Sequence, residues 1–368
     1  MAHIYNKKSF KMTGLYITYH LGSLFEQPGE YGTSHLMEHL LCKTFKDEYP
    51  LLTKLDINWN AYTSHERIVV HFTGLDKYFT PEIKERLVRK LIGGIKIDEN
   101  EFNTEKDVVL QEYDNSFNDP TTPQNILRIK YNDYGPIGKR SDIENFTFEN
   151  MNEKYEKFLK TPNQIIEVGP SKSDFSFVTF HEDYIVEPRK TKWKQEYKNV
   201  ELEEIPENNN CCVEYLSKIK VKKSDFPALC IALDILMGGL ESPMYNEIRE
   251  KSGLAYSISG GVLKMLNDVF YCFSAETTPQ NKDKIIEKYN MFFDDISKWI
   301  TKNRFDDVIS SYYINDEKAK LFAYNNVGDI INKGLPIMGN AYKKISFEQV
   351  IDAAKKYIIK DNLDLIIH

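Results

Sequence analysis

The chain has 368 residues, which favours two domains because most domains contain about 100–200 residues. Its 48 basic and 55 acidic side chains give a net charge of −7, which argues against a nucleic-acid-binding protein, since such proteins usually carry a basic surplus. The hydrophobic fraction of 41% and the charged fraction of 28% exclude a disordered chain and a coiled-coil rod. No run of about 18 apolar residues occurs, so no membrane-spanning helix is expected.

The first twelve residues and the cysteines bear on location. The N-terminal segment MAHIYNKKSFKM has neither the apolar core nor the cleavage site of a signal peptide. The five cysteines are odd in number and include no CxxC pair, so neither a disulfide framework nor a cysteine-based zinc site is expected. A reducing, cytoplasmic location fits this pattern best.

The first half of the chain alternates strand-like and helix-like segments. In chain order, the predicted elements are a strand at 13–23, a helix at 33–45, a strand or hairpin at 58–73, helices at 81–93, 98–117 and 146–160, and a short strand at 164–168. Thr33 or Ser34 is expected to cap the helix that follows them.

A change of character separates the two halves. Residues 181–210 are dense in charge and contain two prolines and an Asn run, which is typical of a linker. The pattern then restarts with a strand at 211–216, a helix at 224–237, a Gly-Gly pair and another helix. These blocks predict an α+β fold with a first domain at 1–185, a linker at 186–210 and a second domain at 211–368.

The most informative segment is HLMEH at residues 35–39. On a helix, His35 and His39 lie four residues apart on one face, where two imidazoles can bind one zinc ion. Glu38 lies within about 100° of both around the helix axis, so it can act as general base on a water at the metal without being a ligand. This arrangement is the inverted zinc motif H-x-x-E-H. The alternative is a surface helix with polar pairs at i,i+4.

A catalytic zinc site usually has three protein ligands, so a third must come from elsewhere in the chain. The predicted helix at 98–117 offers Glu105 and Glu112, two helical turns apart on one face, with Val108 and Val109 between them. One interpretation makes Glu112 the ligand and Glu105 an outer partner that orients an imidazole. The other is an ordinary charged helix face.

Several segments resemble the M16 peptidases, the family of pitrilysin, insulin-degrading enzyme and the mitochondrial processing peptidase. Near the histidines the resemblance is carried by GSLFEQPGEYGTSHLMEHLL, and further on by NWNAYTSHERIVVHF and EKDVVLQEYDNSFNDP. In the last of these, Glu112 follows His39 by 73 residues. The resemblance continues in YGPIGKRSDIENFTFENMNEKYEKFLKTPNQIIEVG and MGGLESPMYNEIREKSGLAYSIS, so that it covers most of the chain.

The resemblance implies a zinc peptidase site. It implies one Zn²⁺ per chain held by His35, His39 and Glu112, with Glu105 as the outer partner. It makes Glu38 the general base that takes a proton from the attacking water and passes it to the leaving amine.

Two further groups of residues are assigned by the resemblance alone. Tyr256 would donate a hydrogen bond to the oxygen of the tetrahedral intermediate, and Arg249 would hold the substrate backbone. Taken by themselves, Arg249 fits a surface ion pair and Tyr256 a core aromatic. An edge strand would bind an extended peptide through main-chain hydrogen bonds, and it contains Asn60, Ala61, Tyr62 and Thr63.

The resemblance also implies the architecture and the partners. Two related domains are expected, each with a mixed, mostly antiparallel sheet and helices packed on one face, together forming half of a clamshell. In the family the Arg–Tyr pair belongs to the half opposite the zinc, so a homodimer or a related M16 partner is expected to complete the site. The predicted activity is hydrolysis of peptides or unfolded polypeptides, without nucleic-acid or membrane partners. The alternative is a non-catalytic subunit that binds peptides or assists assembly.

Overall fold

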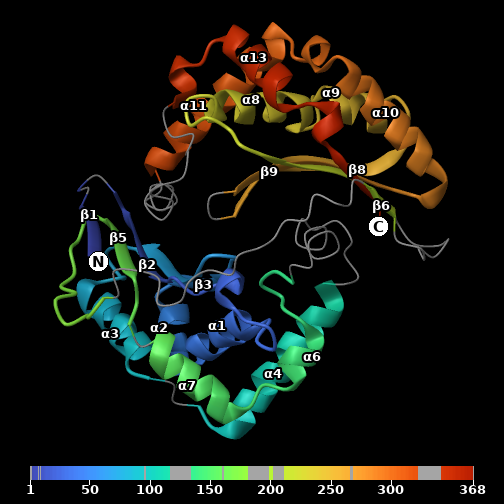
Figure 1. Cartoon of the computed structure of the whole chain (residues 1–368). Coiled ribbons are helices and arrows are strands. Elements are labelled where there is room, and N and C mark those ends of the chain that lie inside the picture. The colour runs from blue at the N-terminus through green and yellow to red at the C-terminus, as the bar shows by residue number, and fades with distance from the viewer. Residues whose placement is uncertain are drawn as a thin grey trace. The chain divides into compact units, whose positions relative to one another are not determined.

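Two five-stranded sheets form the framework of the protein, one in each of the two units into which the chain divides. Figure 1 shows the computed structural model, which describes residues 2–6, 8, 10–94, 97–116, 134–159, 161–180, 199–201, 211–265, 268–321 and 341–367. Each sheet contains one parallel pair of strands and is otherwise antiparallel.

The first sheet presents one strand edge that matters for the site. Its strands, in spatial order, are β1 (Ala2–Asn6), β5 (Gln164–Gly169), β2 (Met12–Tyr19), β4 (Ile68–Leu75) and β3 (Asn58–Thr63). Strands β2 and β4 are rich in β-branched and aromatic residues, which pack well on a pleated surface. Within the described residues, β3 pairs only with β4, so its other edge is free of a neighbouring strand.

Helices cover one face of the first sheet (Figure 1). They are α1 (Thr33–Lys43), α2 (Tyr49–Lys54), α3 (Pro81–Ile92), α4 (Glu99–Ser116), α6 (Arg140–Glu144) and α7 (Phe148–Phe158), with the 3₁₀ turns η1 (Ser23–Phe25) and η2 (Lys46–Glu48). Helix α1 contacts β3, β4, α4 and α7. It therefore lies at the centre of this unit, and its apolar residues Leu36, Met37, Leu40 and Leu41 are buried.

The second unit repeats this arrangement with its own sheet. Its strands, in spatial order, are β6 (Asn199–Glu201), β10 (Asp364–Ile367), β7 (Cys211–Ile219), β9 (Asp268–Thr277) and β8 (Ala255–Met265). The helices lie on one side of this sheet (Figure 1) and include α8 (Phe226–Met237), α9 (Pro243–Tyr245), α10 (Lys282–Asp294), α11 (Lys302–Leu321) and α13 (Phe347–Tyr357). Ten of the twelve residues of α8 are buried, which explains why its sequence is apolar on every face.

The two sheets have the same topology. Numbered from the first strand of each unit, both have the order 1-5-2-4-3, and in both the pair 1–5 is the parallel one. The sequence shows the matching order of elements but no residue-level repeat, so the duplication becomes evident only in the fold. The predicted class, α+β with two related units of mostly antiparallel sheet and helices on one face, is confirmed.

The local predictions for the first half agree well with the structure. The strand expected at 13–23 appears as β2, the helix expected at 33–45 as α1, the segment 58–73 as the β3–β4 hairpin and the helix expected at 98–117 as α4. Inside the predicted linker, the described residues 199–201 form β6, and the other linker residues lie outside the described part of the chain. Among the described helices, none is both long and apolar enough to cross a membrane.

Candidate metal centre

Helix α1 begins at a fixed point because a buried carboxylate caps it. The Glu26 carboxylate accepts hydrogen bonds from the amides of Gly32 (2.9 Å) and Ser34 (2.7 Å), where the helix dipole favours negative charge. Gly32 has a φ of 103°, and a Cβ there would meet Cγ1 of Ile143 at 2.8 Å, so this position requires glycine. The expected cap was wrong, because Thr33 already lies in the first turn of the helix. Glu26 thus fixes the start of α1 and, with it, the position of the HLMEH motif on this helix.

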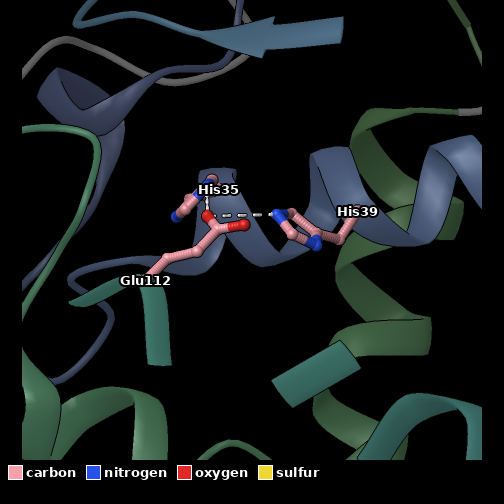
Figure 2. Close-up of side chains that lie close together, drawn as sticks. All are labelled: His35, His39 and Glu112. Atoms are coloured by element: carbon pink, nitrogen blue, oxygen red, sulfur yellow. Dashed lines mark ion pairs between the residues drawn. The ribbon is translucent and has the colours of Figure 1, made fainter. Parts of the chain in front are cut away.

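Three side chains from α1 and α4 converge on one point (Figure 2). Nε2 of His35 lies 3.2 Å from Oε2 of Glu112, and Nε2 of His39 lies 3.6 Å from the same oxygen. The hydrogen bond with His35 is the main cause that lowers the pKa of Glu112, and the nearby charge of His39 adds to it. We call His35, His39 and Glu112 the candidate metal centre.

The chemistry and spacing of these donors fit a zinc ion. Zinc prefers tetrahedral sites with nitrogen and oxygen ligands at roughly 2.1 Å, which places ligand atoms about 3.4 Å apart. The two measured separations, 3.2 and 3.6 Å, lie on either side of this value, and the three donor atoms all lie within 4.8 Å of one another. Two imidazoles and a carboxylate also leave a fourth position open for water, as in catalytic zinc sites.

A thiol on the same helix is not one of the converging donors. Cys42 follows His39 by three residues. Burial, together with the carboxylates of Glu38 and Glu105, raises the pKa of Cys42 to about 12.

Glu105 contacts His39 from the side away from Glu112. Its Oε2 lies 3.1 Å from Nδ1 of His39, and the residue is only 7% exposed. A proton on Nδ1 of His39 would satisfy this contact and leave Nε2, the nitrogen nearer Glu112, to bind a metal ion. This contact matches the outer-partner role expected for Glu105, and it lies two turns along α4 from Glu112.

Glu38 is held by the edge strand. The hydroxyl of Thr63 on β3 donates a hydrogen bond of 2.8 Å to Oε2 of Glu38 on α1. The sequence predicted Thr63 only as part of a peptide-binding strand, so this side-chain contact was missed. Nothing in the local sequence indicated it, because residues 38 and 63 approach each other only when α1 packs on β3.

The strand expected to bind peptide lies at the free edge of the first sheet. Along β3, the side chains of Asn60 and Tyr62 are exposed, whereas those of Ala61 and Thr63 are half-buried. Oδ1 of Asn60 accepts a hydrogen bond of 2.9 Å from the amide of Ala61. In the described part of the chain no other strand pairs with this edge of β3.

Arg249 and Tyr256 lie together in the second unit, each on irregular backbone. Arg249 belongs to η3 (Asn246–Glu250), a π-helical turn, and Tyr256 is the extra residue of a β-bulge at the start of β8. The guanidinium carbon of Arg249 lies 5.0 Å from the ring of Tyr245 and 5.6 Å from the ring of Tyr256. The side chain of Tyr256 is largely exposed, at 73%. Both backbone irregularities are enriched at functional sites because they redirect side chains.

The structure therefore brings the predicted residues together in two groups. In the first unit, Glu105 contacts His39 of the candidate metal centre, and Glu38 of the same helix is hydrogen-bonded to Thr63 of the edge strand. In the second unit, Arg249 and Tyr256 form a pair. The contribution of Glu26 was not predicted, and the signal that could have indicated it is an acidic residue shortly before a Gly that opens a helix.

Family descriptions match both units of the chain. The family described as Insulinase (Peptidase family M16) matches residues 1–134, and the one described as Peptidase M16 inactive domain matches residues 142–312. An uncharacterized zinc protease of Rickettsia bellii (strain RML369-C) is 23% identical over 281 residues. The match covers 69% of this chain and 65% of that protein, which is slightly less than two thirds of its length.

Solved structures share the fold at low sequence identity. A protease from Helicobacter pylori superimposes with a TM-score of 0.80 at 18% identity, covering 100% of this chain and 95% of that one. The periplasmic protease PqqL from Escherichia coli gives a TM-score of 0.76 at 13% identity. That match covers 99% of this chain but 43% of the PqqL chain.

Proposed function

The chain belongs to the M16 peptidase family, and from this premise we propose that it is a zinc-dependent metalloendopeptidase that hydrolyses peptides or unfolded polypeptide segments. The observation that carries the proposal is the convergence of His35, His39 and Glu112, with spacings that suit one zinc ion. Glu38 stands next to His39 in the chain and completes the set of groups that peptide hydrolysis needs.

The residues around the metal have separate tasks. Zn²⁺ bound there supplies Lewis-acid chemistry, which polarises the scissile carbonyl and lowers the pKa of a water towards neutrality. Glu38 takes a proton from the attacking water and later gives it to the leaving amine. The hydroxyl of Thr63 holds the Glu38 carboxylate in place, so that little reorganisation is needed when the proton moves.

Binding of the substrate uses main-chain groups and the Arg–Tyr pair. An extended peptide adds to the free edge of β3, which gives affinity with little sequence preference. The exposed Tyr256 hydroxyl donates to the oxygen on which negative charge develops. Arg249 binds carbonyl oxygens of the substrate, and the rings of Tyr245 and Tyr256 hold its guanidinium group.

A non-catalytic, peptide-binding subunit is the second candidate. It is favoured by the description of residues 142–312 as an inactive domain. However, Glu38 and all three candidate ligands lie in the segment 1–134, which matches the other family description. A zinc peptidase would use all four of these residues, whereas a non-catalytic, peptide-binding subunit would need none of them for its function.

Cleavage of a library of quenched fluorescent peptides tests the proposal. We expect the zinc-loaded protein to cleave peptides, to lose this activity after treatment with a chelator and to regain it when zinc is returned. A folded protein of similar composition serves as the control substrate and should remain intact. Peptide binding without any cleavage by the zinc-loaded protein would favour the second candidate and overturn the first.

We propose further that two chains cooperate in each active site. The PqqL chain is more than twice as long as the region that this chain matches, so this chain has the length of one half of that protease. Arg249 and Tyr256 of one chain would then act on peptide held beside the metal centre of another. The partner is a second copy of this chain or a related M16 subunit.

Mixing two inactive variants tests this cooperation. A Glu38→Gln chain and a Tyr256→Phe chain should each be weakly active alone, because each lacks one catalytic group. Co-expressed with different affinity tags, they should recover roughly a quarter of wild-type activity, because half of randomly paired dimers are mixed and each mixed dimer has one intact site. Mixed dimers can be purified through both tags. If they recover no activity, Tyr256 and Glu38 of the same chain act in one site.

A wild-type protein that is monomeric in analytical ultracentrifugation and fully active would also contradict the proposal.

A further inference from the structure

The last turn of α1 places the ammonium group of Lys43 beside Glu105. Lys43 follows His39 by four residues, so both side chains lie on the same face of the helix. Nζ of Lys43 lies 2.7 Å from Oε1 of Glu105, while Oε2 of Glu105 lies 3.1 Å from Nδ1 of His39. The two oxygens of one carboxylate are therefore divided between an ammonium group and an imidazole.

We infer that Lys43 is a positioning residue of the metal site, which acts through Glu105 to fix the orientation of the His39 ring. This inference rests on the proposed function, since it concerns how the chain holds zinc. With Oε1 occupied by Lys43, the carboxylate is oriented so that Oε2 meets Nδ1 of His39. Nε2 is then the nitrogen that faces Glu112, as zinc binding requires.

Burial distinguishes this ion pair from an ordinary surface pair. The side chain of Glu105 is 10% exposed and that of Lys43 is 33% exposed. A carboxylate so deeply buried is held in one orientation by the groups that contact it. Without Lys43, Glu105 would keep the His39 contact alone and would be free to rotate.

A neighbouring ion pair to the same helix α4 offers a matched control. Lys46 in η2 forms an ion pair with Glu101, which lies one turn before Glu105 on α4. Its two side chains are 46% and 32% exposed. Among the described residues, Glu101 makes no contact with a histidine, so Lys46→Met removes a cation from this region without touching the imidazole.

Zinc affinity, measured by competition with a chromophoric chelator, is the first readout. We expect Lys43→Met to raise the dissociation constant for zinc by about tenfold, at the low end of what loss of an outer partner costs. Lys43→Arg keeps the charge and should remain within about twofold of the wild type, as should Lys46→Met. Equal affinities for Lys43→Met and Lys46→Met would overturn the inference.

The metal-free protein provides a second, independent readout. Imidazole nitrogen NMR of histidine-labelled protein reports which ring nitrogen of His39 carries the proton. We expect the Nδ1 signal of His39 to shift in Lys43→Met, because the Glu105 oxygen that faces this nitrogen is no longer held in place. His35 is the internal reference, because within the described residues its Nδ1 has no hydrogen-bond partner. An unchanged His39 signal in Lys43→Met would contradict the inference, whether or not the protein binds zinc.

A double-mutant cycle tests the route through Glu105. In a Glu105→Gln background, Lys43→Met should cause no further loss of zinc affinity, because the carboxylate through which it acts is gone. Additive losses would show that Lys43 acts by another route and would overturn the inference. If the wild type bound no zinc at all, the proposed function would fail, and the NMR experiment would still decide the role of Lys43.

Discussion

Replacing Glu38 with glutamine is expected to lower kcat for peptide cleavage by about 10²–10⁴-fold, the usual contribution of a positioned general base. Glutamine has nearly the same size and keeps an oxygen that can accept the hydrogen bond from Thr63, so the local structure should persist. It cannot take a proton from the attacking water. Zinc content should remain at one ion per chain, because Glu38 is not one of the three converging donors. Steady-state kinetics and metal analysis of the same preparation measure both effects.

Glu149→Gln is the matched control for this variant. Glu149 is an exposed carboxylate in the first turn of α7, so the same chemical change there should leave kcat and zinc content as in the wild type. If Glu38→Gln cleaved peptide as fast as Glu149→Gln, the assignment of Glu38 as general base would be wrong. A rise in KM with unchanged kcat would assign Glu38 to substrate binding instead.

The second large effect is expected for Glu112→Gln. The carboxylate oxygen of Glu112 lies between the two imidazoles, and the substitution replaces an anionic donor with a neutral amide. The dissociation constant for zinc should rise by more than the roughly 10- to 100-fold typical of outer partners, because a direct ligand is lost. Cleavage should fall in proportion to zinc occupancy and recover in part when zinc is added in excess.

The control for Glu112→Gln lies on the same helix. Asp107 is an exposed residue of α4, and Asp107→Asn removes a negative charge without changing the converging donors. Isothermal titration of both metal-free variants with zinc gives the comparison. Equal affinities for the two variants would mean that Glu112 does not hold the metal.

The local elements of the fold could be predicted because the signals for them are local. The apolar residues of α1 recur at helical spacing, and β2 and β4 carry the β-branched and aromatic residues typical of strands. The repeated strand order could not be predicted from residues, because β1 and β5 are separated by about 160 positions and no residue-level repeat marks the second sheet. Strand β6 was missed for a related reason, since its three residues lie in a charged segment and form a strand only through pairing with β10.

Part of the candidate metal centre could be predicted from the sequence, and part could not. The spacing of His35 and His39 is a property of one helix, so the sequence alone placed both imidazoles on one face. That Glu112 approaches them depends on how α4 packs against α1, so helical spacing left Glu112 as one of two interpretations and the family resemblance favoured it. Contacts made by flexible polar side chains across elements, such as those of Glu26 and Lys43, leave no periodic signal in the sequence. They had to be found in the folded chain.

We propose that two segments of one chain hold a single zinc ion, and a crystallographic map of the metal tests this most directly. Crystals grown with one equivalent of zinc should show one anomalous peak at the zinc edge. We predict this peak at about 2.0–2.2 Å from Nε2 of His35, from Nε2 of His39 and from a carboxylate oxygen of Glu112. A strong peak at other residues, with no density between these three side chains, would contradict the account.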